Sequence, residues 1–308
     1  MASPPHLENK NERIKISFIF GTRPEAIKLC PLIKEMKKTS RYIPHVCVTG
    51  QHREKLDQVL EIFHIKPDVD LNLMEPEQSL ASLTSKLIKN IDSYLIDQKP
   101  SLVFVQGDTT TAFCASIASF YNQIPLGHIE AGLRTWDMLS PFPEEMNRVL
   151  STRLANFHFA PTEKSKNNLR KEHIKDKNIF LTGNTVIDAL FFALKKVRNT
   201  PPSIQDLPEY LFKKHHPPIV LITGHRRENF GKGFKDICTA ISNLADQFAD
   251  THFIYPVHLN PNVQKPVYSL LGNKTNTHLI APLNYLQFVF LMDHSKLILT
   301  DSGGIQEE

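Results

Sequence analysis

The sequence predicts an α/β protein with two domains, each built around a parallel β-sheet. Short runs rich in β-branched and aromatic residues alternate with longer segments whose apolar residues recur every three or four positions. This pattern is typical of buried strands that alternate with helices, and it favours sheets covered on both faces. The chain has 308 residues, which is more than one hydrophobic core usually supports.

The first domain opens with a predicted strand at 13–21 and a helix at 24–39, where Pro24 suits the first helical turn. The same pair of strand and helix then repeats along the chain. The further pairs lie at 42–50 and 52–63, 101–108 and 109–121, 125–132 and 143–155, 156–161 and 162–173, and 178–184 and 185–197.

A segment with five prolines, at 198–218, interrupts this alternation. We therefore expect one domain over 1–183 and a second over 184–308, with the helix before the interruption already part of the second. The second domain resumes with strands at 219–225, 251–258, 278–282 and 297–304 and a helix at 234–248.

Composition excludes several classes of function. The 36 basic and 32 acidic residues nearly balance and are spread along the chain, so no basic stripe indicates nucleic acid as a partner. Cys30, Cys47, Cys114 and Cys238 are far apart and form no CxxC pair, which favours a reducing, cytoplasmic setting without a structural metal. No apolar run approaches the roughly 18 residues of a membrane span, and the first dozen residues have no secretory pattern, so we expect no membrane partner.

Polar clusters follow the predicted strands, and ligands of such sheets bind at the carboxyl ends of the strands. If the two domains face each other, these clusters meet in one cleft. The clusters are GTRPE, TGQHRE, QGDTTT, HIEAGLRT, TGN, TGHRREN, PVHLNP and DSGG.

Two of these clusters are candidate phosphate sites. Gly21 precedes a helix start that carries Arg23 and Lys28, and free N–H groups at a helix start favour an anion. In the segment 301–304, two glycines would let the backbone approach a diphosphate closely. Each segment alone also fits an ordinary turn.

Two other clusters carry carboxylates. Asp108 ends a strand directly before a helix, where it or Thr109 could simply cap that helix. His128 and Glu130 are expected on the same side of one strand, and Gly132 permits a sharp exit. Burying a carboxylate in so apolar a strand is costly without partners, so function is favoured for Glu130.

Glu144 and Glu145 begin the next predicted helix, with Arg148 four residues beyond Glu144. The helix dipole and an ion pair between Glu144 and Arg148 explain this segment without a functional role. Its place just after Glu130 favours a functional role as well.

His225 and Arg226 end the first strand of the second domain, and His258 ends the next strand as a weaker candidate of the same kind. The sequence has no GxGxxG, HExxH or GxSxG motif. A nicotinamide enzyme of the usual kind is therefore not expected, and we expect no cofactor.

Taken together and in order, GTRPEAIK, GQHRE, QGDTTT, HIEAGLRT, FPEEMNR, TGNTVIDAL, TGHRREN and DSGGIQEE resemble the non-hydrolysing UDP-N-acetylglucosamine 2-epimerases, from about Arg13 to the last residue. The resemblance implies a glycosyltransferase-B-like fold and interconversion of UDP-GlcNAc and UDP-ManNAc for surface polysaccharides. It implies a homodimer, and a further UDP-GlcNAc as an activator. The family continues beyond GGIQEE, so we expect the second domain of this chain to be truncated.

The resemblance also implies residue roles, carried over motif by motif. The implied catalytic residues are Asp108, Glu130, Glu144 and His225. The implied substrate-binding residues are Arg23, Lys28, Arg148, Ser302, Gly303, Gly304 and Glu308. The residues implied for the activating UDP-GlcNAc are Gln51, Arg226 and His258.

The family reaction explains these residue types. The proton on C2 of the sugar has no adjacent carbonyl to acidify it, so its removal must accompany the departure of UDP from C1. Elimination to 2-acetamidoglucal and re-addition of UDP need proton-transfer groups on two faces of the sugar, which clustered carboxylates supply. Two alternatives share the same fold: a UDP-sugar-dependent glycosyltransferase and a non-catalytic UDP-sugar-binding protein.

Overall fold

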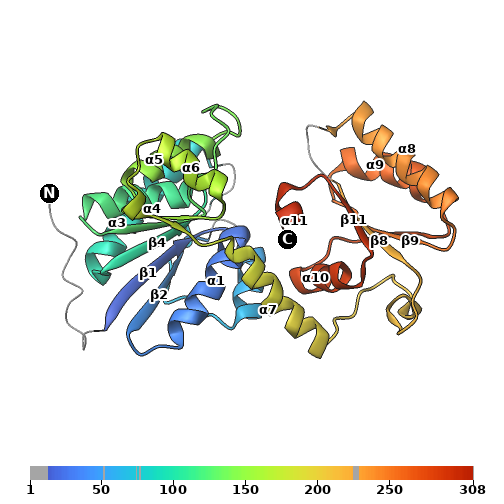
Figure 1. Ribbon diagram of the computed structural model, residues 1–308, viewed down its shortest axis with the longest axis horizontal. Coiled ribbons are helices and arrows are strands. Elements are labelled where there is room, and N and C mark those ends of the chain that lie inside the picture. The colour runs from blue at the N-terminus through green and yellow to red at the C-terminus, as the bar shows by residue number, and fades with distance from the viewer. Residues whose placement is uncertain (1–12, 51–52, 74, 76–77, 225–228, 308) are drawn as a thin grey trace. The chain divides into compact units, whose positions relative to one another are not determined.

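The computed structural model describes residues 13–50, 53–73, 75, 78–224 and 229–307 (Figure 1). The chain divides into two compact units, Met1–Ala189 and Leu190–Glu308. Both are α/β units with parallel sheets, as the sequence predicts.

The first unit has, within the described residues, a seven-stranded parallel sheet in the order β3-β2-β1-β4-β5-β6-β7. Helices α3 to α6 cover one face of the sheet and α1 the other (Figure 1). The strands are β1 (Ile14–Phe20), β2 (Tyr42–Val48), β3 (Val69–Asp70), β4 (Leu102–Gln106), β5 (Leu126–Ile129), β6 (Phe157–Ala160) and β7 (Ile179–Leu181). The helices are α1 (Arg23–Lys37), α2 (Arg53–Phe63), α3 (Leu80–Gln98), α4 (Thr110–Tyr121), α5 (Glu144–Leu154) and α6 (Glu163–Lys171), with a 3-10 turn at Asp176–Asn178.

The second unit has, over its described part, a four-stranded parallel sheet in the order β10-β9-β8-β11. Its strands are β8 (Ile219–Thr223), β9 (His252–Pro256), β10 (Thr277–Ile280) and β11 (Leu297–Thr300). Its helices are α8 (Lys232–Gln247), α9 (Pro261–Leu271), α10 (Tyr285–His294) and α11 (Gly303–Glu307), with a 3-10 turn at Glu209–Phe212.

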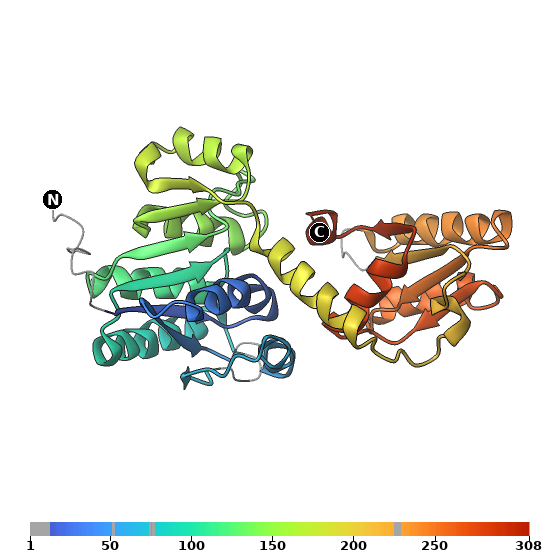
Figure 2. The same ribbon diagram turned by 60° about the horizontal axis from the view of Figure 1, so that its bottom comes forward.

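Helix α7 (Thr185–Asn199) begins in the first unit and ends in the second as one continuous helix (Figures 1 and 2). Ala189 is fully buried on the first-unit side of the division. Ala193 and Val197 belong to a core cluster of the second unit that also includes Ile219 and Ile254. The apolar residues of α7 are therefore buried in both units, near its start in the first and near its end in the second.

Several helices and strands of the structure are not among those predicted from the sequence. Helix α3 has buried apolar residues at Leu83, Leu87 and Ile91, and its N-cap Ser79 accepts a hydrogen bond from the N–H of Ser82. Both are signals that the sequence contains. Helices α9 and α10 and the two-residue strand β3 were also not predicted.

Strand order reverses between β1 and β4, because β1 continues to β2 on one side while β4 continues to β5 on the other. The segments after these two strands therefore lie side by side at the carboxyl edge of the sheet. This is where α/β sheets bind ligands. The four cysteines are free thiols, and all are buried.

Candidate active site

Glu130 lies at this edge, one residue beyond β5, and pairs with Lys28 from α1. The Nζ atom of Lys28 is 2.6 Å from both carboxylate oxygens. The side chains of Gln106 and Asn184 also donate to the carboxylate of Glu130. Because the Glu130 side chain is only 8% exposed, these donors are the partners that a buried carboxylate requires.

The predicted placement of His128 and Glu130 on one side of a strand is wrong. β5 ends at Ile129, and Glu130 has a left-handed backbone with φ of 63°. Strand alternation therefore does not direct its side chain. The buried ring of His128 instead donates from Nε2 to the carbonyl of Gly107, at 2.7 Å. Burial lowers the pKa of His128 to about 3, so the ring is neutral at pH 7.

Asp108 does not cap α4. Thr109 is the N-cap, and its hydroxyl accepts a hydrogen bond from the N–H of Ala112. The carboxylate of Asp108 instead accepts from Arg148, whose Nε lies 3.1 Å from Oδ2 and whose Nη2 contacts the same oxygen. The side-chain amide of Asn147 donates to the Asp108 carbonyl at 2.8 Å, so α5 holds both the backbone and the side chain of Asp108.

The expected ion pair between Glu144 and Arg148 is also wrong. Helix α5 begins at Glu144, and Arg148 pairs with Glu145 at 3.0 Å and with Asp108. Glu145 is buried, whereas Glu144 is half-buried in the first turn of the helix. From the sequence, Glu145 is expected only to favour the helix dipole, and its contact with Arg148 is not predicted. An arginine three residues along the helix was the available signal.

The start of α1 differs from the expected anion site. The N–H groups of Gly21 and Thr22 donate to the carboxylate of Glu25 at 3.0 and 2.8 Å, so these two donors are already used. The hydroxyl of Thr109 donates to the other oxygen of Glu25 at 2.7 Å. Burial raises the pKa of Glu25. Arg23 is exposed, and any phosphate contact there falls to its side chain rather than to these two backbone groups.

The glycine segment of the second unit follows β11, as predicted. The N–H of Asp301 donates to the carbonyl of Thr223, and that of Ser302 to the hydroxyl of Thr300. Gly303 and Gly304 begin α11 and are exposed. His258 is exposed, beyond the end of β9. Of the other predicted site residues, four lie outside the described residues: Gln51, His225, Arg226 and Glu308.

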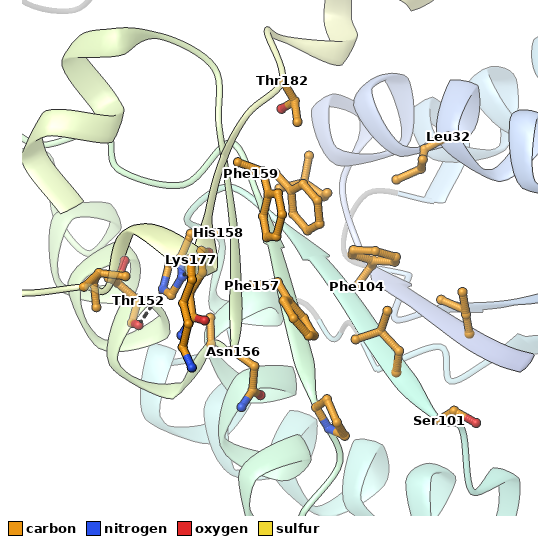
Figure 3. Close-up of a pocket in the computed structure, with 18 of the residues that line it drawn as sticks. Leu32, Ser101, Phe104, Thr152, Asn156, Phe157, His158, Phe159, Lys177 and Thr182 are labelled. Carbon is orange, nitrogen blue, oxygen red and sulfur yellow. Dashed lines mark hydrogen bonds between the residues drawn. The ribbon is translucent and has the colours of Figure 1, made fainter. Parts of the chain in front are cut away.

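A cavity of about 960 Å³ lies against one face of the first sheet. Phe104, Phe157 and Phe159 line it from β4 and β6 (Figure 3). Asp108, Glu130 and Glu144 are not among its lining residues. The cavity is thus separate from the edge where the carboxylates gather.

The described part of the chain has neither a candidate metal site nor a helix that could span a membrane. Among the described residues, no three side chains of His, Cys, Asp or Glu are grouped so that they could hold a metal ion. Within the same ranges, the helices are too short or too polar to span a membrane.

The two parallel sheets, with polar clusters beyond their strands, define a protein of the glycosyltransferase-B-like class. A glycosyltransferase of kitacinnamycin has this fold at 10% identity, with a TM-score of 0.57 over 96% of this chain and 78% of the other. The family profile "UDP-N-acetylglucosamine 2-epimerase" matches residues 34–308. The chain belongs to this family.

Individual relatives agree with this assignment. The UDP-N-acetylglucosamine 2-epimerase of Salmonella typhimurium is 52% identical over 296 residues, which are 96% of this chain and 79% of that protein. The crystal structure of UDP-GlcNAc 2-epimerase from Neisseria meningitidis bound to UDP-GlcNAc has a TM-score of 0.86 and 52% identity, over 96% of this chain and 80% of that one. The complex from Methanocaldococcus jannaschii with UDP-GlcNAc and UDP has a TM-score of 0.74 and 32% identity, over 95% and 80%.

Proposed function

We propose that this protein is an isomerase that interconverts UDP-GlcNAc and UDP-ManNAc. One observation carries the proposal: two carboxylates, Asp108 and Glu130, follow the neighbouring strands β4 and β5, and each is paired with its own cation. A Cβ atom added to Gly107 would lie 3.8 Å from Oε2 of Glu130, so the Glu130 carboxylate lies close to the backbone next to Asp108.

This arrangement suits proton transfer at C2 of the sugar. A carboxylate must remove the C2 proton while the bond from C1 to the diphosphate breaks, which gives 2-acetamidoglucal and UDP. Protonation of C2 from the opposite face and re-addition of UDP then give the epimer. Asp108, Glu130 and Glu144 are the proposed proton-transfer groups, because removal and return of the proton on two faces need more than one group.

The diphosphate needs positive charge or N–H donors as it leaves. We assign this role to the exposed Arg23 side chain and to the segment Ser302–Gly304, in which Ser302 directly precedes α11 and the two glycines begin it. Lys28 and Arg148 are assigned to the sugar side, because each already pairs with a carboxylate there.

The test is NMR of UDP-GlcNAc with the protein in deuterated water. We expect UDP-ManNAc with deuterium at C2, because solvent returns the proton that the carboxylate removed. UDP-ManNAc that stays fully protonated at C2 would contradict the exchange through these carboxylates. Binding without turnover would favour a UDP-sugar-binding protein, and turnover only with an added acceptor would favour a glycosyltransferase.

The carboxylates are tested with Asp108→Asn, Glu130→Gln and Glu144→Gln. Each should keep UDP binding and lower kcat by roughly a hundredfold or more, as loss of a general acid or base does. Glu163→Gln is the control, because Glu163 is exposed in the first turn of α6. Near-normal turnover of Glu144→Gln would leave that residue with only a helix-dipole role.

Two further properties are part of the proposal. We expect a homodimer, which sedimentation would test, and an activating UDP-GlcNAc that contacts His258. Activation predicts a sigmoidal dependence of the rate on UDP-GlcNAc that becomes hyperbolic in His258→Ala. We also expect the product to supply surface polysaccharide synthesis.

A further inference from the structure

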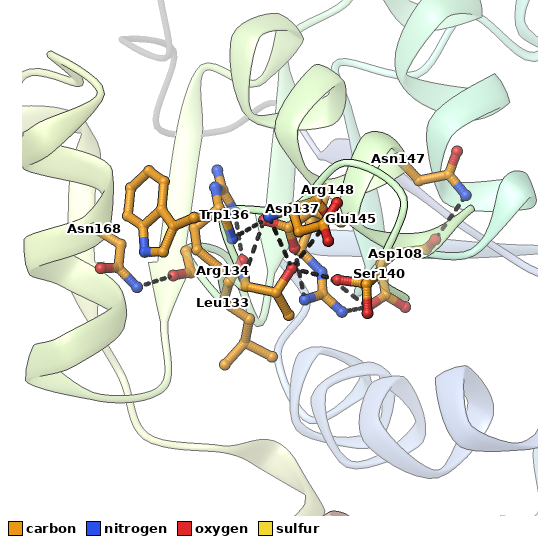
Figure 4. Close-up of polar contacts among 12 residues, drawn as sticks. Asp108, Leu133, Arg134, Trp136, Asp137, Ser140, Glu145, Asn147, Arg148 and Asn168 are labelled. Atoms are coloured by element: carbon orange, nitrogen blue, oxygen red, sulfur yellow. Dashed lines mark hydrogen bonds and ion pairs between the residues drawn. The ribbon is translucent and has the colours of Figure 1, made fainter. Parts of the chain in front are cut away.

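Glu145 connects a loop to the proposed reaction site through one buried carboxylate. Its Oε1 atom accepts from the backbone N–H groups of Thr135 and Trp136, both at 3.0 Å. Its Oε2 atom accepts from Nη1 of Arg148, also at 3.0 Å. Figure 4 shows Glu145 between Arg148 and the loop that carries Trp136. The Glu145 side chain is 1% exposed, so these three donors take the place of the water that would solvate an exposed carboxylate.

The contact with Glu145 sets the orientation of Arg148. A guanidinium group is planar and donates in fixed directions. With Nη1 held by Glu145, Nε and Nη2 of Arg148 are directed at the Asp108 carboxylate. The backbone around Asp108 is held by other contacts. His128 donates to the Gly107 carbonyl, and Asn147 donates to the Asp108 carbonyl. Within this network, Glu145 is the acidic partner that opposes Asp108 across the arginine.

We propose that Glu145 is a positioning residue, which holds the guanidinium of Arg148 against the carboxylate of Asp108 and ties this pair to the Trp136 loop. The inference rests on the proposed function, in which Asp108 transfers a proton. The competing explanation is that Glu145 only fixes the loop. The two explanations differ in which carboxylate oxygen matters for turnover.

Two substitutions separate the oxygens. Glu145→Gln is nearly isosteric, and its amide oxygen can still accept from the N–H groups of Thr135 and Trp136. Its NH₂ group cannot accept from Arg148, so only the contact with Arg148 is lost. Glu145→Ala removes both contacts. Glu163→Gln serves again as the exposed acidic control in a first helical turn.

Trp136 is the only tryptophan of the chain, so tryptophan emission reports on its loop alone. We expect Glu145→Gln to keep the emission spectrum of the wild type but to lower the free energy of unfolding, because a buried ion pair is broken. We expect its kcat to fall about tenfold, with KM changed less than threefold. Glu145→Ala should change the emission as well. The kcat of the double variant Glu145→Gln with Arg148→Lys should equal that of Arg148→Lys, because Glu145 acts through Arg148.

A kcat of Glu145→Gln equal to that of the wild type would overturn the proposal. So would a double variant whose loss in kcat is the product of the losses in Glu145→Gln and Arg148→Lys. A wild-type protein that does not convert UDP-GlcNAc would count against the proposed function instead. The unfolding free energies of the two single variants and the double variant would then test the link itself. Non-additive losses support the link between Glu145 and Arg148, and additive losses overturn it.

Discussion

The Nζ atom of Lys28 lies 2.6 Å from each carboxylate oxygen of Glu130, which joins α1 to the end of β5. Both side chains are largely withdrawn from solvent, at 19% and 8% exposure. A charge-assisted hydrogen bond in such a place is worth about 1.5–3 kcal/mol. The pair thus fixes a carboxylate whose position the strand itself does not determine.

The Lys28 contact predicts a loss of turnover in Lys28→Met. We expect kcat to fall about ten- to hundredfold, because Glu130 loses its cation while the apolar stem at position 28 is retained. Lys37→Met is the matched control, since Lys37 is exposed on the same helix. The measurement is the rate of UDP-ManNAc formation by NMR. Equal rates in both variants would remove Lys28 from the site.

A second prediction concerns stability and the pair of Arg134 and Glu172. The Arg134 side chain is fully buried, and its Nε and Nη2 atoms donate to the two oxygens of Glu172 at 2.5 and 3.1 Å. Breaking a buried pair leaves an uncompensated charge, so Arg134→Leu should lower the free energy of unfolding by about 3–5 kcal/mol. Urea denaturation measures this loss.

The control for this prediction is Arg170→Leu. Arg170 also donates twice to one carboxylate, that of Asp176, but this pair is on the surface. Water and salt screen the exposed pair, so its loss should leave stability nearly unchanged. Similar losses in both variants would show that burial does not decide the strength of these pairs.

The third prediction is that acid destabilises the protein through His128. Burial lowers the pKa of this ring to about 3, whereas in the unfolded chain its pKa is near 6.5. Between these values the unfolded state binds more protons, so stability is present above pH 6.5 and is lost as the pH falls toward 3. From pH 7 to pH 5 this one group removes about 2 kcal/mol.

Urea denaturation of the wild type and of His128→Gln at pH 7 and pH 5 tests this. The variant should be less stable at pH 7, because the hydrogen bond to the Gly107 carbonyl is disturbed, and its stability should depend less on pH. Burial also lowers the pKa of His158, so part of the acid sensitivity should remain. The same slope in both proteins would contradict a role for His128.

The fourth prediction concerns Gly132, which has φ of 91° at the exit from the Glu130 segment. A Cβ atom there would lie 2.3 Å from the carbonyl oxygen of Ser165. Gly132→Ala should therefore destabilise the protein by about 2–4 kcal/mol, from the clash and the left-handed backbone together. Gly233→Ala in α8 is the control, since its added Cβ meets nothing within 4 Å and should stabilise by up to about 1 kcal/mol.

The fold was predictable because parallel strands buried on both faces are nearly continuous apolar runs, as in β4 and β8. Even so, α3 was missed, although its apolar spacing is regular. For the site, the sequence predicted which segments after the strands contribute residues, but not how their side chains are directed and paired. The direction of Glu130 depends on a left-handed backbone beyond β5, and the choice of Glu145 over Glu144 as the partner of Arg148 depends on which one packs inward. These features arise from tertiary contacts that residue spacing does not encode.

Because its four cysteines are buried, the folded protein should react slowly with thiol reagents. Burial raises the pKa of Cys30 and Cys114 to about 12 and that of Cys238 to about 11, so each thiol stays protonated and shielded. Modification then records openings of the chain. Cys238 belongs to the second unit and the other three cysteines to the first. Their relative labelling rates would therefore show whether the two units unfold together in one cooperative transition or independently at different rates.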